Sequence, residues 1–319
     1  LAFSASDIAF IVGTQLGYDT DPAIWFDEIV TVRREGRGAI AGFSSGVDSW
    51  FTLKRALLDC NAPSLRLNTL LVNDVGANKS EAKVREVVAR AREVAGEHHL
   101  GVVIVRSNMD RFLSMGFQAT HTIRNASVAH LLTSLCDTFH YASTNTYRAA
   151  GVFPTYDMES ADTILLPLLS TDAMRLVSSG STKTRAEKTR AIVDIPGVEE
   201  RLDVCVHDRP DDTSPLNCGR CMKCQRTAVT LEALGVLDRF APVFDMRAYR
   251  RFRLAYLHLV ATSTRPMERE VFDVAREAGL VGPRLLYMPG SLALRGARRV
   301  ARAWSSRRQA RGVLRTARV

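Results

Sequence analysis

A run of small residues, Phe43 to Ser49, contains groups that could hold phosphate. It follows the apolar residues 39–42 and precedes a helix-like stretch, 50–58. Gly46 and its small neighbours allow backbone N–H groups to turn inward as an anion nest, and the positive end of the next helix adds to that nest. Three hydroxyl groups could donate further hydrogen bonds to phosphate, those of Ser44, Ser45 and Ser49.

Asp48 is the unusual member of this loop. A carboxylate beside phosphate repels it unless Mg²⁺ or a backbone donor lies between them. Its presence therefore indicates a site for a metal-bound nucleotide. A Walker A loop is excluded, because no Gly-Lys-Ser/Thr follows at the required spacing. The plainer alternative is an ordinary strand–turn–helix with a Ser-rich N-cap.

Cysteines form a second candidate site. Three thiols have CxxCxxC spacing and a fourth lies upstream, which gives the set Cys205, Cys218, Cys221 and Cys224. Four thiolates converging on one ion suit tetrahedral zinc, and backbone N–H groups between them can bond to sulfur. His207 is the alternative fourth ligand. An iron–sulfur cluster or a catalytic persulfide is the rival interpretation, and Cys60 and Cys136 are expected to be buried packing residues.

Alternating strands and helices must position the phosphate loop. The apolar stretches 67–72, 101–105 and 139–143 are typical of strands, whereas 80–95 and 125–137 have helical patterns. Such an order predicts a parallel sheet with right-handed crossovers. Ligands of these sheets bind at the carboxyl ends of the strands, where the loop would lie.

Other residues are expected near the same edge. Asn73 and Asp74 follow the second strand, where they could contribute to a site at this edge, although an ordinary turn explains them equally well. We expect a helix capped by Ser170 or Thr171. His121 precedes a helix on the cleft side, and it is the histidine most worth testing.

Length and composition indicate a folded protein with a substantial core, since 46% of the 319 residues are hydrophobic. No apolar stretch reaches membrane-spanning length. The segment Leu1–Gly13 lacks the basic region of a secretory signal, so a cytoplasmic location is expected. The sequence starts without Met, and residues before Leu1 could be missing. A homo-oligomer is possible, and the sequence does not fix the oligomeric state.

The net charge of +9 is concentrated at one end. Residues 291–319 include nine arginines and no acids, which leaves 34 basic and 34 acidic residues in 1–290. This Arg-rich tail could bind RNA, anionic lipid or an acidic partner. A solvated terminal helix explains it at least as well, and nucleic-acid binding is not the favoured expectation.

The loop resembles a known motif. Phe43-Ser44-Ser45-Gly46-Val47-Asp48-Ser49 is similar to the SGGxDS pyrophosphate loop of the N-type ATP pyrophosphatases, the PP-loop superfamily. Ser45 stands where that pattern usually has Gly, and a non-Gly residue costs about 1 kcal/mol if the position requires positive φ. The resemblance implies cleavage of ATP between the α and β phosphates, with residues 44–49, Asn73 and Asp74 binding ATP and Mg²⁺.

Further segments resemble the 7-cyano-7-deazaguanine synthases of this superfamily. Pro167-Leu168 followed by Arg185-Ala186-Glu187-Lys188 is similar to a Pro-Leu then Lys-Ala-Glu pattern, which suggests Lys188 as a phosphate ligand beside the catalytic Asp48. A solvated helix face with charge pairs is the alternative for Lys188. Arg124-Asn125 resembles an Arg-Asn pair that opens a helix and contacts substrate. The family's zinc ligands correspond to Cys205, Cys218, Cys221 and Cys224.

The resemblance implies a parallel α/β core of the adenine nucleotide alpha hydrolase-like (HUP) class, with a small zinc lobe and a helical C-terminal extension. The expected organisation is a lead-in at 1–36, the PP-loop core at 37–195, the zinc lobe at 196–245, the helical extension at 246–290 and the tail at 291–319.

The implied enzyme is an AMP-forming ligase or transferase that adenylates a small-molecule carboxylate or amide, releases pyrophosphate and then forms a C–N bond with an amine or ammonia donor. Two alternatives stay open. One is sulfur transfer to a nucleobase, perhaps of tRNA, and the other is a non-catalytic nucleotide-binding module.

Overall fold

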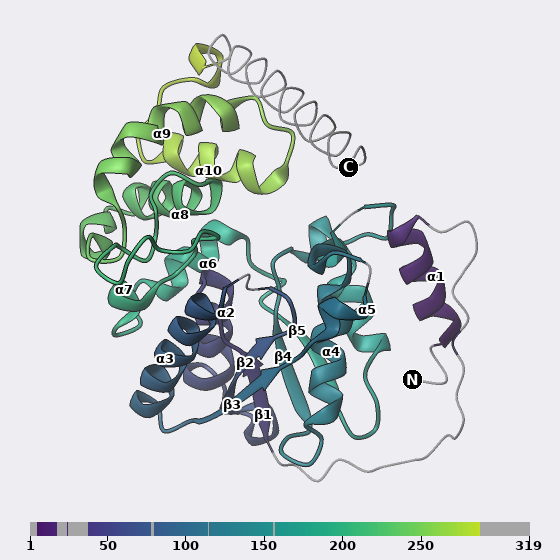
Figure 1. Ribbon diagram of the computed structural model, residues 1–319. Coiled ribbons are helices and arrows are strands. Elements are labelled where there is room, and N and C mark those ends of the chain that lie inside the picture. Colours follow the sequence, from purple (N-terminus) through teal and green to yellow (C-terminus); the bar gives the residue numbers. More distant parts are fainter. Residues whose placement is uncertain are drawn as a thin grey trace, which may run out of the picture. The chain divides into compact units, whose positions relative to one another are not determined.

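The chain consists of two compact units, Leu1–Asp212 and Thr213–Val319, which are described separately. The computed structural model (Figure 1) describes residues 5–17, 24, 38–77, 80–113, 115–155 and 157–287. The Arg-rich tail and most of the N-terminal lead-in lie outside these residues.

The first unit is built on a five-stranded sheet whose strands all run parallel, in the order β3-β2-β1-β4-β5. The strands are β1 (Ala39–Gly42), β2 (Leu67–Asp74), β3 (Gly101–Arg106), β4 (Thr138–Ala142) and β5 (Arg175–Ser179). The first strand is central because its residues are apolar or small and almost fully buried, and Ile40 pairs with Thr69 on one side and Phe139 on the other. The predicted parallel sheet is confirmed.

Helices cover both faces of this sheet. In Figure 1, α2 and α3 lie on one face, and α4 and α5 lie on the other. The helices of this unit are α1 (Ala5–Leu16), α2 (Val47–Leu53), α3 (Glu81–Glu97), α4 (Phe117–Leu131), α5 (Asp162–Leu168), α6 (Arg185–Ile192) and α7 (Val198–Arg201).

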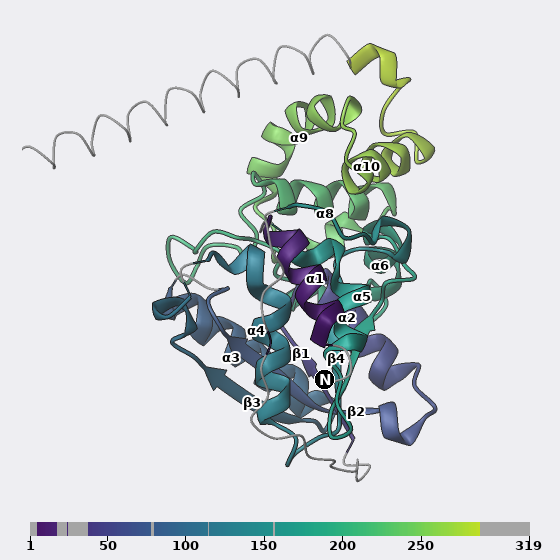
Figure 2. The ribbon, with the colours of Figure 1, turned by 90° about the vertical axis from the view of Figure 1, so that its right-hand side faces the viewer.

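The core on the α4 and α5 face also includes the N-terminal helix. Figure 2 shows α1 beside α5, and its Ile8 and Ile11 belong to the same buried cluster as Phe139 of β4 and Leu165 of α5. Residues 5–16 therefore contribute to the packing of this unit, although the sequence offered only a mildly apolar pattern for them.

Local signals fix where the site-bearing helices begin. The Ser80 side chain accepts a hydrogen bond from the Lys83 N–H at the start of α3. Thr184 and Glu187 form a reciprocal capping box at the start of α6, which satisfies two backbone donors that the helix itself leaves unpaired. Helix α2 continues as a π-helix, Lys54–Leu58, closed by a 2.9 Å hydrogen bond from the Asp59 N–H to the Lys54 carbonyl.

Two helix predictions are wrong. The expected helix capped by Ser170 or Thr171 is absent from the described chain, where a turn leads into β5; the Leu-rich run before it forms α5 instead. The helix expected at 125–137 is α4, Phe117–Leu131, so Arg124-Asn125 lies in its middle and does not open it. The first turns of α4 bury three polar residues, Thr120, His121 and Thr122. Because the buried face is polar there, the sequence lacks the apolar periodicity from which the start of the helix could have been predicted.

The second unit is helical where it is described. It contains α8 (Met222–Ala233), α9 (Met246–Ala261) and α10 (Pro266–Glu277). Apolar faces hold it together, with Val229 of α8, Val260 of α9 and Phe272 of α10 all buried. No helix in either unit, as far as the residues are described, is long and apolar enough to cross a membrane.

Asp203 links three segments of the first unit. Its carboxylate accepts hydrogen bonds from Lys83 at 2.7 Å and Arg90 at 2.6 Å, both on α3, and its N–H donates to the Ser45 carbonyl at 2.9 Å. The Asp203 side chain is only 2% exposed. A buried carboxylate is tolerated here because two cations surround it.

We predict that Asp203→Ala destabilises the protein by about 3 kcal/mol, because it leaves the buried Arg90 guanidinium with only the longer contact to Glu86 at 3.8 Å. Urea-induced unfolding, followed by circular dichroism, measures the loss.

Asp59→Ala is the matched control, since Asp59 pairs with Lys54 at 3.0 Å but its side chain is 46% exposed. This variant should lose less than about 1 kcal/mol. Equal losses in the two variants would contradict a structural role specific to Asp203.

Candidate functional site

The phosphate loop follows β1 directly, at the carboxyl end of the sheet. The Phe43 N–H bonds to the Leu71 carbonyl of β2 at 2.9 Å, and the chain then turns into α2. The N–H groups in the first turn of any α-helix have no acceptor within the helix. Gly46, the N-cap residue of α2, has no side chain that could accept from them. This arrangement suits an anion, because the helix dipole also places partial positive charge there.

Ser45 adopts the left-handed conformation, with φ of 61°, and is completely buried. The position therefore does require positive φ, at a cost of about 1 kcal/mol for a non-Gly residue. The hydrogen bond from Asp203 to the Ser45 carbonyl helps to hold the conformation. Within the described chain the buried Ser45 hydroxyl has no hydrogen-bond partner, which fits a donor reserved for a ligand or water.

Asp48 lies between two cations from α6. Arg185 Nη2 is 2.7 Å from one carboxylate oxygen and Lys188 Nζ is 3.2 Å from the other. Lys188 is fully buried and also donates to the Ser143 carbonyl at the end of β4. The solvated-face alternative for Lys188 therefore fails. Two cations against one carboxylate leave this end of the loop with a net positive charge, as anion binding requires.

The end of β2 is joined to α4. Asn73 and Asp74 are the last residues of β2 and do not follow it, and the Asn73 amide donates to the Asn125 side chain at 2.8 Å. Asn73 Oδ1 is buried without a hydrogen-bond partner among the described residues. Burial raises the pKa of Asp74, while Arg106 lowers it by a smaller amount.

Arg124 has mainly internal partners. It donates to Thr120 Oγ1, to the Val75 and Met115 carbonyls and to Asp110, which occupies four of its five N–H groups. Gly76 allows this close approach, since it has φ of +102° and a Cβ there would lie 2.7 Å from Arg124 Nη1. These contacts hold the turn after β2 in place. The predicted contact of Arg124 with substrate stays a prediction.

A titratable cluster lies at the end of β4, beside the loop. His121 Nδ1 is 2.7 Å from the Tyr141 hydroxyl, and its Nε2 is 3.2 Å from Asp157. Burial lowers the pKa of His121, but the nearby carboxylates of Asp157 and Asp162 raise it by a larger amount. The pKa of His121 is therefore raised above its usual value of 6.5. The sequence singled out His121 but gave no signal for its partners.

Asp162 and Glu159 complete this cluster. Burial raises the pKa of Asp162 from 3.8 to about 7, opposed by His121 and by the Thr122 hydroxyl, which donates to it. Burial also raises the pKa of Glu159, which experiences the charges of both Arg185 and Asp48. The cluster and the phosphate loop therefore share one electrostatic environment.

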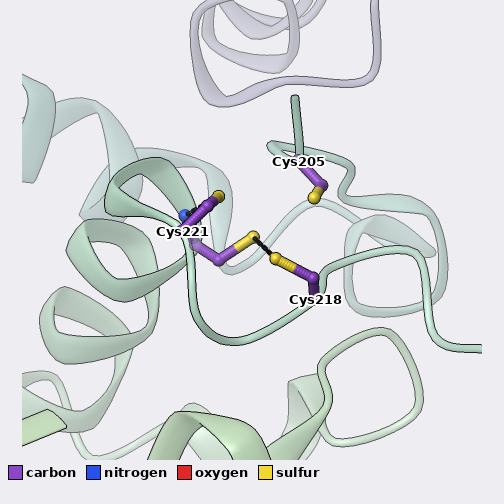
Figure 3. A group of neighbouring side chains, drawn as sticks. Cys205, Cys218 and Cys221 are labelled. Carbon is purple, nitrogen blue, oxygen red and sulfur yellow. Dashed lines mark hydrogen bonds between the residues drawn. The ribbon is translucent and has the colours of Figure 1, made fainter. Parts of the chain in front are cut away.

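The cysteines form a compact group. Figure 3 shows Cys205, Cys218 and Cys221 pointing toward one another, and with Cys224 their sulfur atoms all lie within 4.8 Å of each other. Tetrahedral zinc with Zn–S bonds of about 2.3 Å needs sulfur–sulfur distances of about 3.8 Å, and the Cys218 and Cys224 sulfurs are 3.9 Å apart. The donor set therefore fits zinc.

Backbone groups support these sulfurs, as expected from their spacing. The Cys224 N–H donates to Cys221 Sγ at 3.4 Å, and the His207 N–H donates to Cys205 Sγ at 3.5 Å. Cys205, not His207, is thus the fourth member. Gly219 is required in the turn, because a Cβ there would lie 2.3 Å from the Asp245 carbonyl. Cys136 is buried as predicted, whereas Cys60 is only half-buried.

Sheet order and loop position define the class of protein. Order 3-2-1-4-5 makes the β1/β4 boundary the point where connections reverse, and ligands of such sheets bind there. This is a Rossmann-like parallel α/β fold of the HUP type, as expected from the sequence. No protein-family model matches the chain, and no curated protein is detectably similar to it in sequence. The class is compatible with nucleotide-binding enzymes and fixes no particular activity.

We predict that the purified protein contains one zinc ion per chain and that Cys218→Ser loses it, because the ion would retain only three thiolates. Inductively coupled plasma mass spectrometry measures the metal.

Cys136→Ser is the matched control, since this thiol is buried elsewhere and should leave the zinc content unchanged. Iron with visible absorbance in anaerobically purified protein would contradict the zinc assignment and support an iron–sulfur cluster.

We predict that Asp162→Asn gains stability relative to the wild type as the pH rises from 5 to 8. A pKa raised to about 7 means that Asp162 contributes stability below about pH 4 and loses it as the carboxyl group ionises in the folded state. Between pH 5 and 8 the gain can reach about 2.7 kcal/mol, which is about 1.36 kcal/mol for each pH unit from 5 to the folded-state pKa, and urea unfolding at both pH values measures it.

Asp172→Asn provides the control, because Asp172 is exposed and its substitution should leave the pH dependence unchanged. An Asp162→Asn protein with the same pH dependence as the wild type would rule out a buried ionising carboxyl group.

Proposed function

We propose that this protein is an ATP pyrophosphatase-type enzyme that adenylates a small-molecule carboxylate or amide oxygen and then forms a C–N bond. The observation that carries the proposal is the position of Asp48, Arg185 and the buried Lys188 at the phosphate loop, beside the β1/β4 boundary. A buried lysine shared between a carboxylate and a carbonyl is costly for a purely structural purpose.

The loop and α6 would hold the triphosphate. Backbone N–H groups of the first turn of α2, with the Ser44 and Ser45 hydroxyls, bind the phosphates that leave as pyrophosphate. Arg185 and Lys188 exchange the Asp48 carboxylate for phosphate oxygens, and Asp48 becomes a magnesium ligand. When bound, magnesium would neutralise part of the negative charge of the phosphates. Asn73 and Asp74, on the neighbouring strand, lie where the adenosine would bind.

The cluster after β4 suits the second half of the reaction. Asp157 is 40% exposed, and Glu159 lies in the same electrostatic environment as the loop. Carboxylates attract a cationic amine or ammonium ion, whereas they repel an anionic sulfur donor. This charge favours an amine or ammonia donor. The C–N bond forms when the neutral amine displaces AMP from the activated carbon.

The sulfur-transfer alternative has less support. Four of the six cysteines belong to the cluster, and burial raises the pKa of the Cys136 thiol to about 11, which makes it a poor nucleophile. Thiolation would therefore have to use the cysteine cluster or the half-buried Cys60. The non-catalytic alternative is distinguished by turnover, because a nucleotide sensor would bind ATP without releasing pyrophosphate.

A cytoplasmic location is part of the proposal. None of the six cysteines, all of which lie among the described residues, forms a disulfide, and this fits a reducing compartment, in which ATP is also available.

We predict that Asp48→Ala reduces ATP turnover at least a hundredfold, because Arg185 and Lys188 lose the carboxylate that positions them and magnesium loses a ligand. Pyrophosphate release is measured with Mg-ATP and a panel of carboxylates with ammonium, and ATP binding is measured by calorimetry.

Asp59→Ala is again the control, since Asp59 lies at the other end of the same helical segment and should leave turnover unchanged. The zinc content of both variants should equal that of the wild type. Full turnover by Asp48→Ala would overturn the proposed site, and wild-type binding without pyrophosphate release would support the sensor.

A further inference from the structure

The two units carry opposite net charges. Residues 213–319 contain 21 basic and seven acidic residues, a net charge of +14, whereas residues 1–212 contain 22 basic and 27 acidic residues, a net charge of −5. The positive charge is therefore a property of the whole second unit and is not confined to the Arg-rich tail. Such an asymmetry between parts of a chain points to a polyanionic partner.

Helix α9 carries this charge in its described form. The helix contains no acidic residue, and Arg247, Arg250 and Arg251 are exposed on one face at i, i+3 and i+4 spacing. None of the three forms an ion pair with another described residue. Residues 288–319 include no acid that could neutralise them. Arg253 differs, since it pairs with Glu232 of α8 at 2.5 Å.

The opposite face of α9 is already buried in the second unit. Tyr249, Tyr256 and Val260 are at most 4% exposed. A helix that lies in a membrane surface needs a continuous apolar face free to enter the lipid, whereas the apolar face of α9 is covered and its exposed face carries three arginines. This argues for a partner in solution.

Aromatic and apolar side chains accompany the arginines. Phe252 is 39% exposed and Leu254 is 57% exposed, and the Arg251 guanidinium lies 5.6 Å from the centre of the Phe252 ring. Planar groups of this kind stack on unpaired bases, while arginine binds phosphate through two parallel hydrogen bonds. Bases inside a duplex would not reach Phe252 in this way.

We propose that the face of α9 formed by Arg247, Arg250 and Arg251, with Phe252 at its edge beside Arg251, binds single-stranded nucleic acid. The three guanidinium groups bind successive phosphates, and the ring of Phe252 stacks on a base. This surface lies within the second unit, so the inference does not depend on the proposed adenylation reaction.

The test is the salt dependence of binding by the full chain. Each phosphate contact on a single strand contributes about 0.7 to the slope of log affinity against log salt concentration. We expect the triple variant Arg247→Gln, Arg250→Gln, Arg251→Gln to lower the magnitude of that slope by about 2. Fluorescence anisotropy with labelled single-stranded RNA and DNA oligonucleotides measures it.

A matched control removes the same charge from α10 and its N-cap residue, through Arg265→Gln, Arg269→Gln and Arg276→Gln, which are also exposed, although Arg265 lies 3.7 Å from Glu268. This control should keep the wild-type slope. Phe252→Ala should weaken binding several-fold at an unchanged slope, because it removes stacking and no charge. Binding of both RNA and DNA supports the proposal, and preference for one identifies the sugar that is accepted.

Three outcomes would overturn the proposal. One is an equal loss of slope in the two triple variants, which would mean that only the total charge matters. The second is tighter binding of a duplex than of the single strand. The third is binding to phosphatidylserine vesicles without binding to either oligonucleotide.

Discussion

The buried carboxylate of Asp203 joins parts of the first unit that are far apart in sequence. Through its backbone it holds Ser45 of the phosphate loop, through its side chain it holds Lys83 and Arg90 of α3, and it also accepts a hydrogen bond from the Cys205 N–H. The strained conformation of Ser45 is thus maintained by a charge network outside the loop. The phosphate loop, helix α3 and the segment that carries Cys205 are therefore all held by contacts with the same residue, Asp203.

Local patterns carried most of the prediction of the fold. The strands at 67–72, 101–105 and 139–143 were found because buried parallel strands are short and apolar, and the loop and the cysteines were found because their spacing is part of their chemistry. The failures occur where burial is polar. The start of α4 buries His121 and Thr122 against Tyr141 and Asp162, and β5 at the sheet edge mixes Arg175 and serines with its apolar residues.

The site could be predicted in part, for a similar reason. Asp48 and Lys188 were selected from the sequence, and the structure brings them together across 140 positions. Asp203, Arg185 and the Asp157–Asp162 region were missed because their roles arise from long-range contacts that have no local pattern. A carboxylate becomes significant only when its burial and its neighbours are known.

The π-helix at Lys54–Leu58 accommodates one more residue per turn than the α-helix that it continues. Losing a single residue from this segment would restore the regular repeat while leaving the first turn at Val47, and hence the phosphate loop, unmoved. A change of length at the far end of this helix would therefore repack Ala56 and Leu57, which are buried there, and leave the first turn in place. In an alignment with related chains, such a difference would appear as a one-residue gap just after an ungapped loop.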